Sequence, residues 1–329
     1  MSEMKLDDDI EEFEALVAQN KSVTWTEPEA VFVELTEEAQ KPVWFVDGGN
    51  HAFFNYAYLV AELNRVFAVC YSALDYVGAL GPYNFLSFTF VEGGEVKTKL
   101  YHRALEFLEK QLENREIRKG EVIANLTGRA RRVAELRLAR HLVEREGAEI
   151  VVLDGNFSYL YDTAELKELT SLLSACHENG ASLVGFAKKT TLSKRGRPIT
   201  QYVEQIMRKQ GKDFYWVKVG EAKRGQNPSY NTKLFVAKLN SSAQKPYLVE
   251  VFSNSSNRVL EVLTLNSSSV QSPGYPLGLV HADRVARIRT QIEGELVKLK
   301  LIRLAKSSEQ LAGVLQEAYS HDLLDALNS

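Results

Sequence analysis

Residues 41–50 of the chain have the sequence KPVWFVDGGN, and residues 148–158 have the sequence AEIVVLDGNFS. Each stretch is a short apolar run that ends in an aspartate followed by glycine, a pattern typical of a buried strand that emerges into a turn. The two aspartates are Asp47 and Asp154. We therefore predict two strands that end alike, each projecting a carboxylate into the crevice where α/β sheets place their sites.

The elements around these strands predict an α/β fold with a mixed sheet flanked by helices. We expect strands around 66–75, at 84–101 with a hairpin at Gly93-Gly94, at 148–158 and at 182–188. We expect helices at 103–118, 125–146, 164–180 and 281–299. Residues 220–232 and 266–274 are expected to be loops.

The charge of the chain is unevenly distributed, although the formal net charge is only -3. Residues 1–40 hold twelve acidic residues, and the apolar spacing at 5–20 predicts a helix, so we treat 1–40 as an acidic N-terminal arm before a domain at 41–329. Residues 185–224 hold eleven Lys and Arg against three acids. A local basic surface is what binding to a polyanion requires. A solvated charged loop is the alternative.

The two cysteines, Cys70 and Cys176, lie far apart and suggest neither a disulfide framework nor a zinc site. No apolar run approaches the roughly 20 residues that cross a bilayer. The N-terminus is acidic, unlike a signal peptide. We expect a cytoplasmic protein without a membrane partner.

Two carboxylates on neighbouring strands repel each other, and a bound Mg²⁺ or Mn²⁺ relieves that repulsion through hard oxygen ligands. The alternative is that Asp-Gly is ordinary turn chemistry at both places. Glu135 favours the metal hypothesis, because it lies in an apolar helical pattern at 131–144 that leads into the strand of Asp154. A surface Glu135 paired with Arg131 or Arg132 is the other interpretation.

Several ordered motifs in the chain are similar to those of the NurA nucleases, partners of the HerA DNA-translocating ATPase in DNA end processing. The motifs span residues 41–289: a strand ending in DGG, a helix with ELxLA, a strand ending in LDG, a strand ending in a lysine and a late GYPxxLxxA segment. Their key residues are Asp47, Glu135, Asp154, Lys188 and the segment from Gly274 to Ala282.

The resemblance implies an RNase H-like fold and a two-metal Mn²⁺ or Mg²⁺ site on Asp47, Glu135 and Asp154. A histidine often follows the family alanine, but this chain has Asp283 there and His281 two residues earlier. We prefer Asp283 as the fourth ligand, with His281 as the alternative. Asn50 replaces the serine that often follows the first DGG.

The activity implied by the resemblance is that of a metal-dependent DNA nuclease, a 5′–3′ exonuclease and single-strand endonuclease. It would be a homodimer acting with a hexameric HerA-type ATPase. Lys188 would contact the scissile phosphate. The residues expected to bind DNA are Lys188, Lys189, Lys194, Arg195, Arg197, Tyr275 and His281. Stacking of bases on Tyr215 and Trp216 is a further hypothesis, against a role of these residues in the core.

Three other functions compete with this one. An RNase H-like nuclease acting on RNA or hybrids would use the same ligands. A non-catalytic subunit that clamps DNA or regulates an ATPase would not need several acids in one crevice. A metal-dependent phosphatase would leave the long basic stretch without a purpose.

Overall fold

The structure is a computed structural model that describes residues 23–31, 40–56, 59–103, 105–117, 121–157, 163–226 and 230–305. The helix expected at 5–20 lies outside these residues. The chain forms two compact units. The first unit comprises Met1–Asp47, Ala68–Leu80 and Glu135–Arg284, and the second comprises Gly48–Phe67, Gly81–Ala134 and Val285–Ser329.

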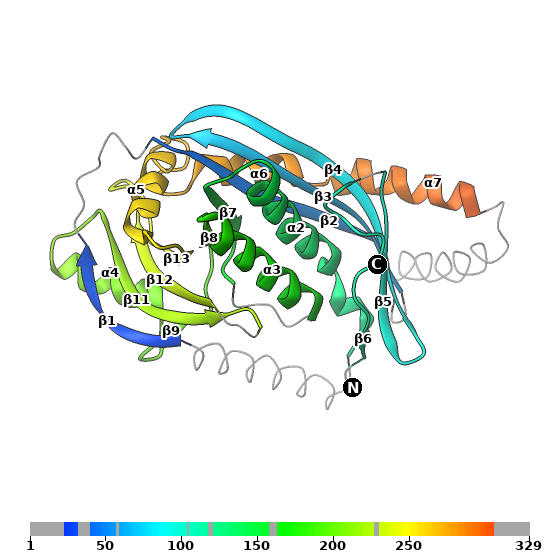
Figure 1. The fold of residues 1–329 in the computed structure, drawn as a ribbon, viewed down its shortest axis with the longest axis horizontal. Helices are drawn as coiled ribbons and strands as arrows, with labels where there is room; N and C mark the ends of the chain where they lie inside the picture. Colours follow the sequence, from blue (N-terminus) through cyan, green and yellow to red (C-terminus); the bar gives the residue numbers. More distant parts are fainter. Residues whose placement is uncertain are drawn as a thin grey trace, which may run out of the picture. The chain divides into compact units, whose positions relative to one another are not determined.

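The first unit is built on a mixed sheet (Figure 1). Its strand order is β1 (Val23–Val31), β11 (Tyr215–Arg224), β12 (Tyr230–Lys238), β13 (Tyr247–Phe252), β8 (Ser182–Ala187), β7 (Ile150–Asp154), β2 (Pro42–Asn55), β3 (Leu59–Ser72) and β4 (Asp75–Glu92). The neighbours β2, β7 and β8 are parallel, whereas β1, β11, β12, β13 and β8 pair antiparallel in turn. β1 therefore brings part of the expected N-terminal arm into the sheet.

The order of elements along the chain confirms the expected fold class. Three strands, β2, β3 and β4, are followed by the helix–strand units α2 (Arg129–Arg145) with β7 and α3 (Thr163–Asn179) with β8. Their order in the sheet, β4-β3-β2-β7-β8, is that of an RNase H-like core. Strands β7 and β8 are buried almost throughout, as continuous apolar runs in parallel strands require.

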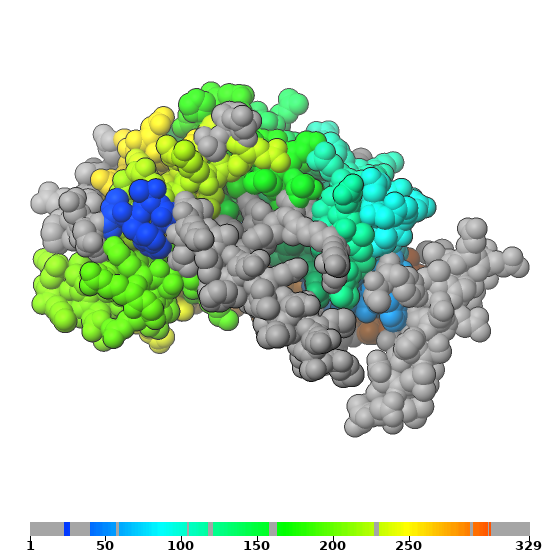
Figure 2. All heavy atoms as spheres, turned by 90° about the horizontal axis from the view of Figure 1, so that it is seen from below, coloured from blue at the N-terminus to red at the C-terminus, as the bar shows by residue number. Residues whose placement is uncertain are grey.

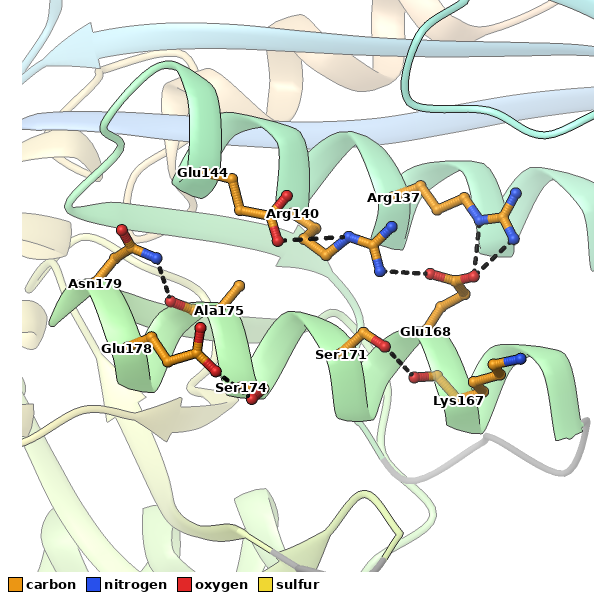
Figure 3. A network of polar contacts seen from close by, with 10 residues as sticks. All are labelled: Arg137, Arg140, Glu144, Lys167, Glu168, Ser171, Ser174, Ala175, Glu178 and Asn179. Atoms are coloured by element: carbon orange, nitrogen blue, oxygen red, sulfur yellow. Dashed lines mark hydrogen bonds and ion pairs between the residues drawn. The ribbon is translucent and has the colours of Figure 1, made fainter.

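Helices α2 and α3 lie side by side in the first unit and are joined by a buried ion-pair network (Figure 3). The Nε of Arg137 in α2 donates to Glu168 in α3 over 2.8 Å. Arg140 reaches the other oxygen of Glu168 at 3.3 Å. Arg137 and Glu168 are both nearly buried. Because both groups are buried, removing either one would leave the other as an uncompensated charge.

The other helices of the first unit are α4 (Ile199–Lys209), α5 (Ser256–Asn266) and α6 (Leu277–Ala286). The apolar face of α4 covers β1, β11 and β12 with Ile199, Val203 and Met207. Tyr215 and Trp216 are 3% and 1% exposed. Stacking of bases on Tyr215 and Trp216 is therefore wrong, and the alternative role in the core holds.

The helix expected at 103–118 does not form. The segment instead runs along the edge of β5 (Glu95–Tyr101): Gln111 bridges Lys99, and the N–H of Leu112 donates to Thr98. Leu108 and Leu112 are buried. An open strand edge offers backbone partners along its whole length, and pairing with it outweighs the intrinsic helix propensity of this segment.

The late helix and one expected loop also differ from the prediction. α6 ends at Ala286, and a π-helical turn at Thr290–Gly294 precedes α7 (Glu295–Ala305), so 281–299 is not one helix. The described part of 220–232 belongs largely to β11 and β12. A Cβ on Gly220 would lie 2.6 Å from the Thr24 oxygen of β1, so glycine allows the two strands to lie this close. The loop expected at 266–274 is confirmed after the end of α5. No helix in the described residues could span a membrane.

The second unit contains the remaining parts of β2, β3 and β4, the strands β5 and β6 (Arg115–Glu116), the 3-10 helix Ile123–Leu126 and α7. The hairpin expected at Gly93-Gly94 is confirmed, with Glu92 paired to Glu95. Both glycines have positive φ, as a type I′ turn requires.

A buried carboxylate, Glu62 of β3, connects several segments of the second unit by hydrogen bonds. Its Oε1 accepts hydrogen bonds from the Asn50 amide at 2.7 Å and from the N–H of Gly128 at 2.9 Å. Ser87 lies 3.4 Å from the other oxygen. Burial raises the pKa of Glu62, although these hydrogen bonds and the charge of Arg131 act in the opposite direction. Ionisation of Glu62 therefore opposes folding.

We expect Glu62→Gln to stabilise the protein increasingly as the pH rises. The unfolded state ionises first, so the wild type loses stability as the pH rises from the unfolded pKa of about 4.3 to the raised folded pKa. Glutamine keeps an acceptor for Asn50 and Gly128 and has no charge. Urea unfolding of both proteins across this range measures the difference. The exposed Glu116→Gln is the control, and a gap between Glu62→Gln and wild type that does not grow with pH would contradict the expectation.

Candidate active site

Asp47 and Asp154 lie at equivalent positions on two neighbouring parallel strands. The register pairs Phe45 with Val152 and Val46 with Leu153, so the next pair is Asp47 with Asp154. Paired residues on parallel strands point to the same face of the sheet. Asp47 is only 7% exposed, and Asp154 is partly exposed. The convergence of the two carboxylates predicted from sequence is thus present in the first unit.

The turn after Asp154 is built with two glycines. Gly155 has φ +101°, and its N–H donates to the carbonyl of Phe186 in β8 over 2.9 Å. A Cβ on Gly185 would lie 2.6 Å from the Gly155 oxygen, so the turn can cross β8 only at a glycine. The sharp turn predicted behind Asp154 is confirmed.

The equivalent prediction behind Asp47 is wrong, because β2 continues through Gly48 and Gly49 to Asn55. Gly49 serves a different purpose from a turn. A Cβ at Gly49 would lie 2.2 Å from the carbonyl oxygen of Ala286. The glycine therefore allows the end of α6 to approach the backbone of β2 within the second unit.

Lys188 and Tyr275 hold the carboxylate of Asp154. The Lys188 ammonium donates to Oδ2 over 2.8 Å, and the Tyr275 hydroxyl donates to Oδ1 over 3.3 Å. The ammonium also lies 5.2 Å from the centre of the Tyr275 ring. The lysine predicted at the end of its strand therefore points at a predicted metal ligand.

The pKa values of Lys188 and Tyr275 are both raised, and nearby aspartates contribute to both shifts. Burial lowers the pKa of Lys188, but the hydrogen bond and charge of Asp154 oppose it, and the charges of Asp47 and Asp283 add to them, so the pKa is raised. Burial is the largest cause of the raised pKa of Tyr275, and the negative charges of Asp154 and Asp47 raise it further. At neutral pH Lys188 is a cation and Tyr275 a neutral hydroxyl.

Helix α6 brings Asp283 toward the same place by packing tightly on β2. A Cβ on Gly278 would lie 2.0 Å from the ring of Phe45, two residues before Asp47. Tyr275 and Asp283 flank this contact in sequence, and the charge of Asp283 acts on Lys188. The GYP segment is therefore part of the site because only glycine lets the helix lie this close.

His281 faces a different set of neighbours from Asp283. Its Nδ1 lies 2.9 Å from the Tyr71 hydroxyl, and its ring packs against Tyr71 and Tyr76. Burial lowers its pKa, and the charge of Arg284 lowers it further. These contacts favour Asp283 over His281 as a ligand. Glu135 is partly exposed on α2, in the first unit, and its place among the ligands stays a prediction.

The carboxylates suit a divalent cation by their chemistry. Among the described residues, no three His, Cys, Asp or Glu side chains already lie close enough together to hold a metal ion. Asp154 is engaged by the Lys188 ammonium, on which the charges of Asp47 and Asp283 also act. The hard oxygen donors of these carboxylates fit Mg²⁺ or Mn²⁺.

Two residues beside Lys188 were missed by the sequence analysis. Tyr247 packs against Phe186 and Tyr275 with ring centres 5.2 and 5.4 Å away. The ammonium of Lys245 lies 5.6 Å from the Tyr247 ring and donates to the carbonyl of Lys188 over 3.3 Å. Only the pairing of β13 with β8 brings them here, and no local motif signals it.

Three of the residues expected to bind DNA, Lys194, Arg195 and Arg197, lie at the hairpin of β9 (Ser193–Lys194) and β10 (Arg197–Pro198) on the first unit. Lys189 is exposed after β8. Arg195 and Gly196 form the positive-φ turn between β9 and β10. Lys194 lies between the rings of Trp25 and Tyr202, and Arg197 donates to Gln205. Figure 2 shows the blue residues of β1 next to the light-green segment that contains α4.

Two solved structures that match this chain share little sequence identity with it and have low TM-scores. The catalytic domain of human endonuclease V has 14% sequence identity and a TM-score of 0.41, covering 86% of this chain and 95% of its own. The Argonaute of Aquifex aeolicus has 9% identity and a TM-score of 0.29, covering 74% of this chain and 28% of its own.

No curated protein matches the chain. The family model described as NurA domain matches residues 41–288, which include Asp47, Glu135, Asp154, Lys188 and Asp283. Because this match covers most of the sequence, the chain belongs to the NurA domain family.

Proposed function

We propose that the protein is a divalent-metal-dependent DNA nuclease that hydrolyses phosphodiester bonds. The observation that carries the proposal is the position of Asp47 and Asp154, each directly after the last registered pair of two adjacent parallel strands, with Lys188 held on Asp154 and Asp283 acting on the same ammonium. Three aspartates whose charges act on one lysine are more characteristic of a catalytic centre than of a binding surface alone.

Asp47, Asp154, Asp283 and Glu135 would hold Mg²⁺ or Mn²⁺ in a two-metal site. When bound, the ions supply charge for the scissile phosphate and lower the pKa of water. Lys188, which donates to Asp154 here, stays charged at neutral pH and could contact a phosphate oxygen as a point charge if a cation engaged Asp154.

In this scheme Tyr275 positions Asp154 and Lys188 and takes no part in the reaction itself. Its raised pKa keeps the hydroxyl protonated, so it can donate to Asp154 but cannot act as a base near neutral pH. Its ring also limits where the Lys188 ammonium can move, because the two lie 5.2 Å apart. Tyr275 thus orients both an acid and a cation of the proposed site.

The finer activity belongs to the same proposal. We take the enzyme to be a 5′–3′ exonuclease and single-strand endonuclease in DNA end processing, a cytoplasmic homodimer that works with a HerA-type hexameric ATPase. Family membership supports this description. The second candidate, a DNA-clamping or regulatory subunit without catalysis, is favoured by the basic hairpin around Lys194 and Arg195. Activity on RNA or hybrids would use the same site.

The wild-type protein is expected to degrade end-labelled DNA with Mn²⁺ or Mg²⁺ and to be inactive in EDTA. Without a divalent cation, the carboxylates of the site would repel the phosphate of the substrate. Single-stranded DNA, duplex DNA and RNA of one sequence, each with and without a HerA-type ATPase, distinguish the candidates. Products shortening from the 5′ end support the exonuclease. Metal-independent cleavage, or DNA binding without cleavage under every condition, would contradict the proposal.

A further inference from the structure

A second lysine stands next to the proposed site without a carboxylate partner. Lys245 is exposed, and its ammonium donates to the backbone oxygen of Lys188 at 3.3 Å. It lies 5.6 Å from the centre of the Tyr247 ring. No acid among the described residues pairs with Lys245, whereas Lys188 is bound to Asp154. Its positive charge is therefore available to an anion from solution.

The loop that carries Lys245 is fixed by the same segment that supplies Tyr275. Asn240 accepts hydrogen bonds from the N–H groups of Ser242 and Ala243, which closes a tight turn. Gly274 has φ +81°, and a Cβ there would lie 2.5 Å from the Cβ of Ala243. The loop and the GYP segment are thus in direct contact. This contact fixes the backbone of the loop just before Lys245.

The aromatic rings connect this lysine to the catalytic carboxylates. Tyr275 donates to Asp154, Tyr247 packs edge-on against Tyr275 at 5.4 Å, and Lys245 lies over Tyr247. Tyr247 is half-buried, so its ring supports the lysine stem while the ammonium stays in solvent. Lys188 and Lys245 therefore place two cations along one wall of the site.

We propose that Lys245, supported by Tyr247, binds a backbone phosphate next to the scissile one on the substrate strand. This inference rests on the proposed nuclease function. Lys188 would face the scissile phosphate once a metal takes Asp154, and Lys245 would hold its neighbour and so fix the register of the strand. A phosphate contact of this kind is independent of base identity.

Binding of fluorescein-labelled oligothymidylate in EDTA, followed by anisotropy at several salt concentrations, tests the inference without cleavage. Each phosphate contact on a single strand contributes about 0.7 to the slope of log K against log salt. Lys245→Gln is expected to weaken binding several-fold and to reduce the slope by about 0.7, equally for oligothymidylate and oligodeoxycytidylate. Lys245→Arg should restore the slope.

Lys110→Gln is the matched control, since Lys110 is exposed, lies in the second unit and changes the net charge equally. An unchanged slope in Lys245→Gln, or an equal loss in Lys110→Gln, would overturn the inference while leaving the nuclease proposal standing. If the wild type binds no DNA, both fail. With metal present, a raised KM and a retained kcat for Lys245→Gln would support substrate binding over chemistry.

Discussion

Alanine at Asp154 or Asp47 is expected to reduce DNA cleavage by roughly 10²–10³-fold or more, the scale of losing one preorganised electrostatic group in an active site. Asp154 is the centre of the site, since it accepts both the Lys188 ammonium and the Tyr275 hydroxyl. Asp47 is buried on the adjacent strand. Each substitution removes a proposed metal ligand and leaves Lys188 with less negative charge to balance it.

The measurement is the initial rate on labelled single-stranded DNA with Mn²⁺, together with thermal unfolding to show that the variants are folded. Asp213→Ala is the matched control. Asp213 has a 75% exposed side chain at the end of a 3.9 Å ion pair with Lys238, so its loss should leave cleavage unchanged. If folded Asp47→Ala and Asp154→Ala cut as fast as wild type, the proposed site is wrong and the cleavage comes from other residues. If the wild type itself binds DNA but does not cut it, the DNA-clamping candidate takes its place.

The pairing of Asp47 with Asp154 could be predicted because it depends on local patterns. Each aspartate closes an apolar run, and the helix–strand order makes the two runs parallel neighbours. The continuation of β2 beyond Asp47 could not be predicted. Gly48-Gly49 looks like a turn in sequence, but Gly49 is needed for close approach of the Ala286 backbone, which lies far away in the chain.

The errors elsewhere have the same origin in contacts between distant segments. Residues 103–118 have helix-forming composition but pair with the edge of β5. Lys245 and Tyr247 follow an unremarkable polar loop, and only the antiparallel pairing of Leu248 with Ala187 brings them beside Lys188. Propensity and motifs report neighbours in sequence, whereas these features depend on which strand lies next to which.

Glu250 is a fully buried carboxylate that ties the proposed site to the sheet. Its Oε1 accepts from Arg224 and from Thr232, each over 2.6 Å. Its Oε2 accepts the N–H of Phe157 over 3.1 Å, in the turn that follows Asp154. Arg224 is itself only 8% exposed. One side chain thus neutralises a buried guanidinium and anchors the loop behind a proposed metal ligand.

Glu250→Ala is expected to lower the free energy of unfolding by about 3–5 kcal/mol, because it leaves Arg224 as a buried, uncompensated charge. Urea unfolding followed by tryptophan fluorescence, to which the buried Trp216 contributes, measures the loss. The double variant Arg224→Met/Glu250→Leu removes both charges and should recover most of the stability. If Glu250→Ala unfolds like wild type, the ion pair does not support the fold.

The same double variant separates stability from function. It removes the charge problem but leaves the N–H of Phe157 without its acceptor, which costs about 1–3 kcal/mol where that group stays buried and loosens the turn behind Asp154. We therefore expect stability to return further than cleavage. Equal recovery of both would mean that Glu250 only balances Arg224. A stable protein with slow cleavage and normal DNA binding would show that Glu250 positions Asp154 through the turn at Gly155–Phe157.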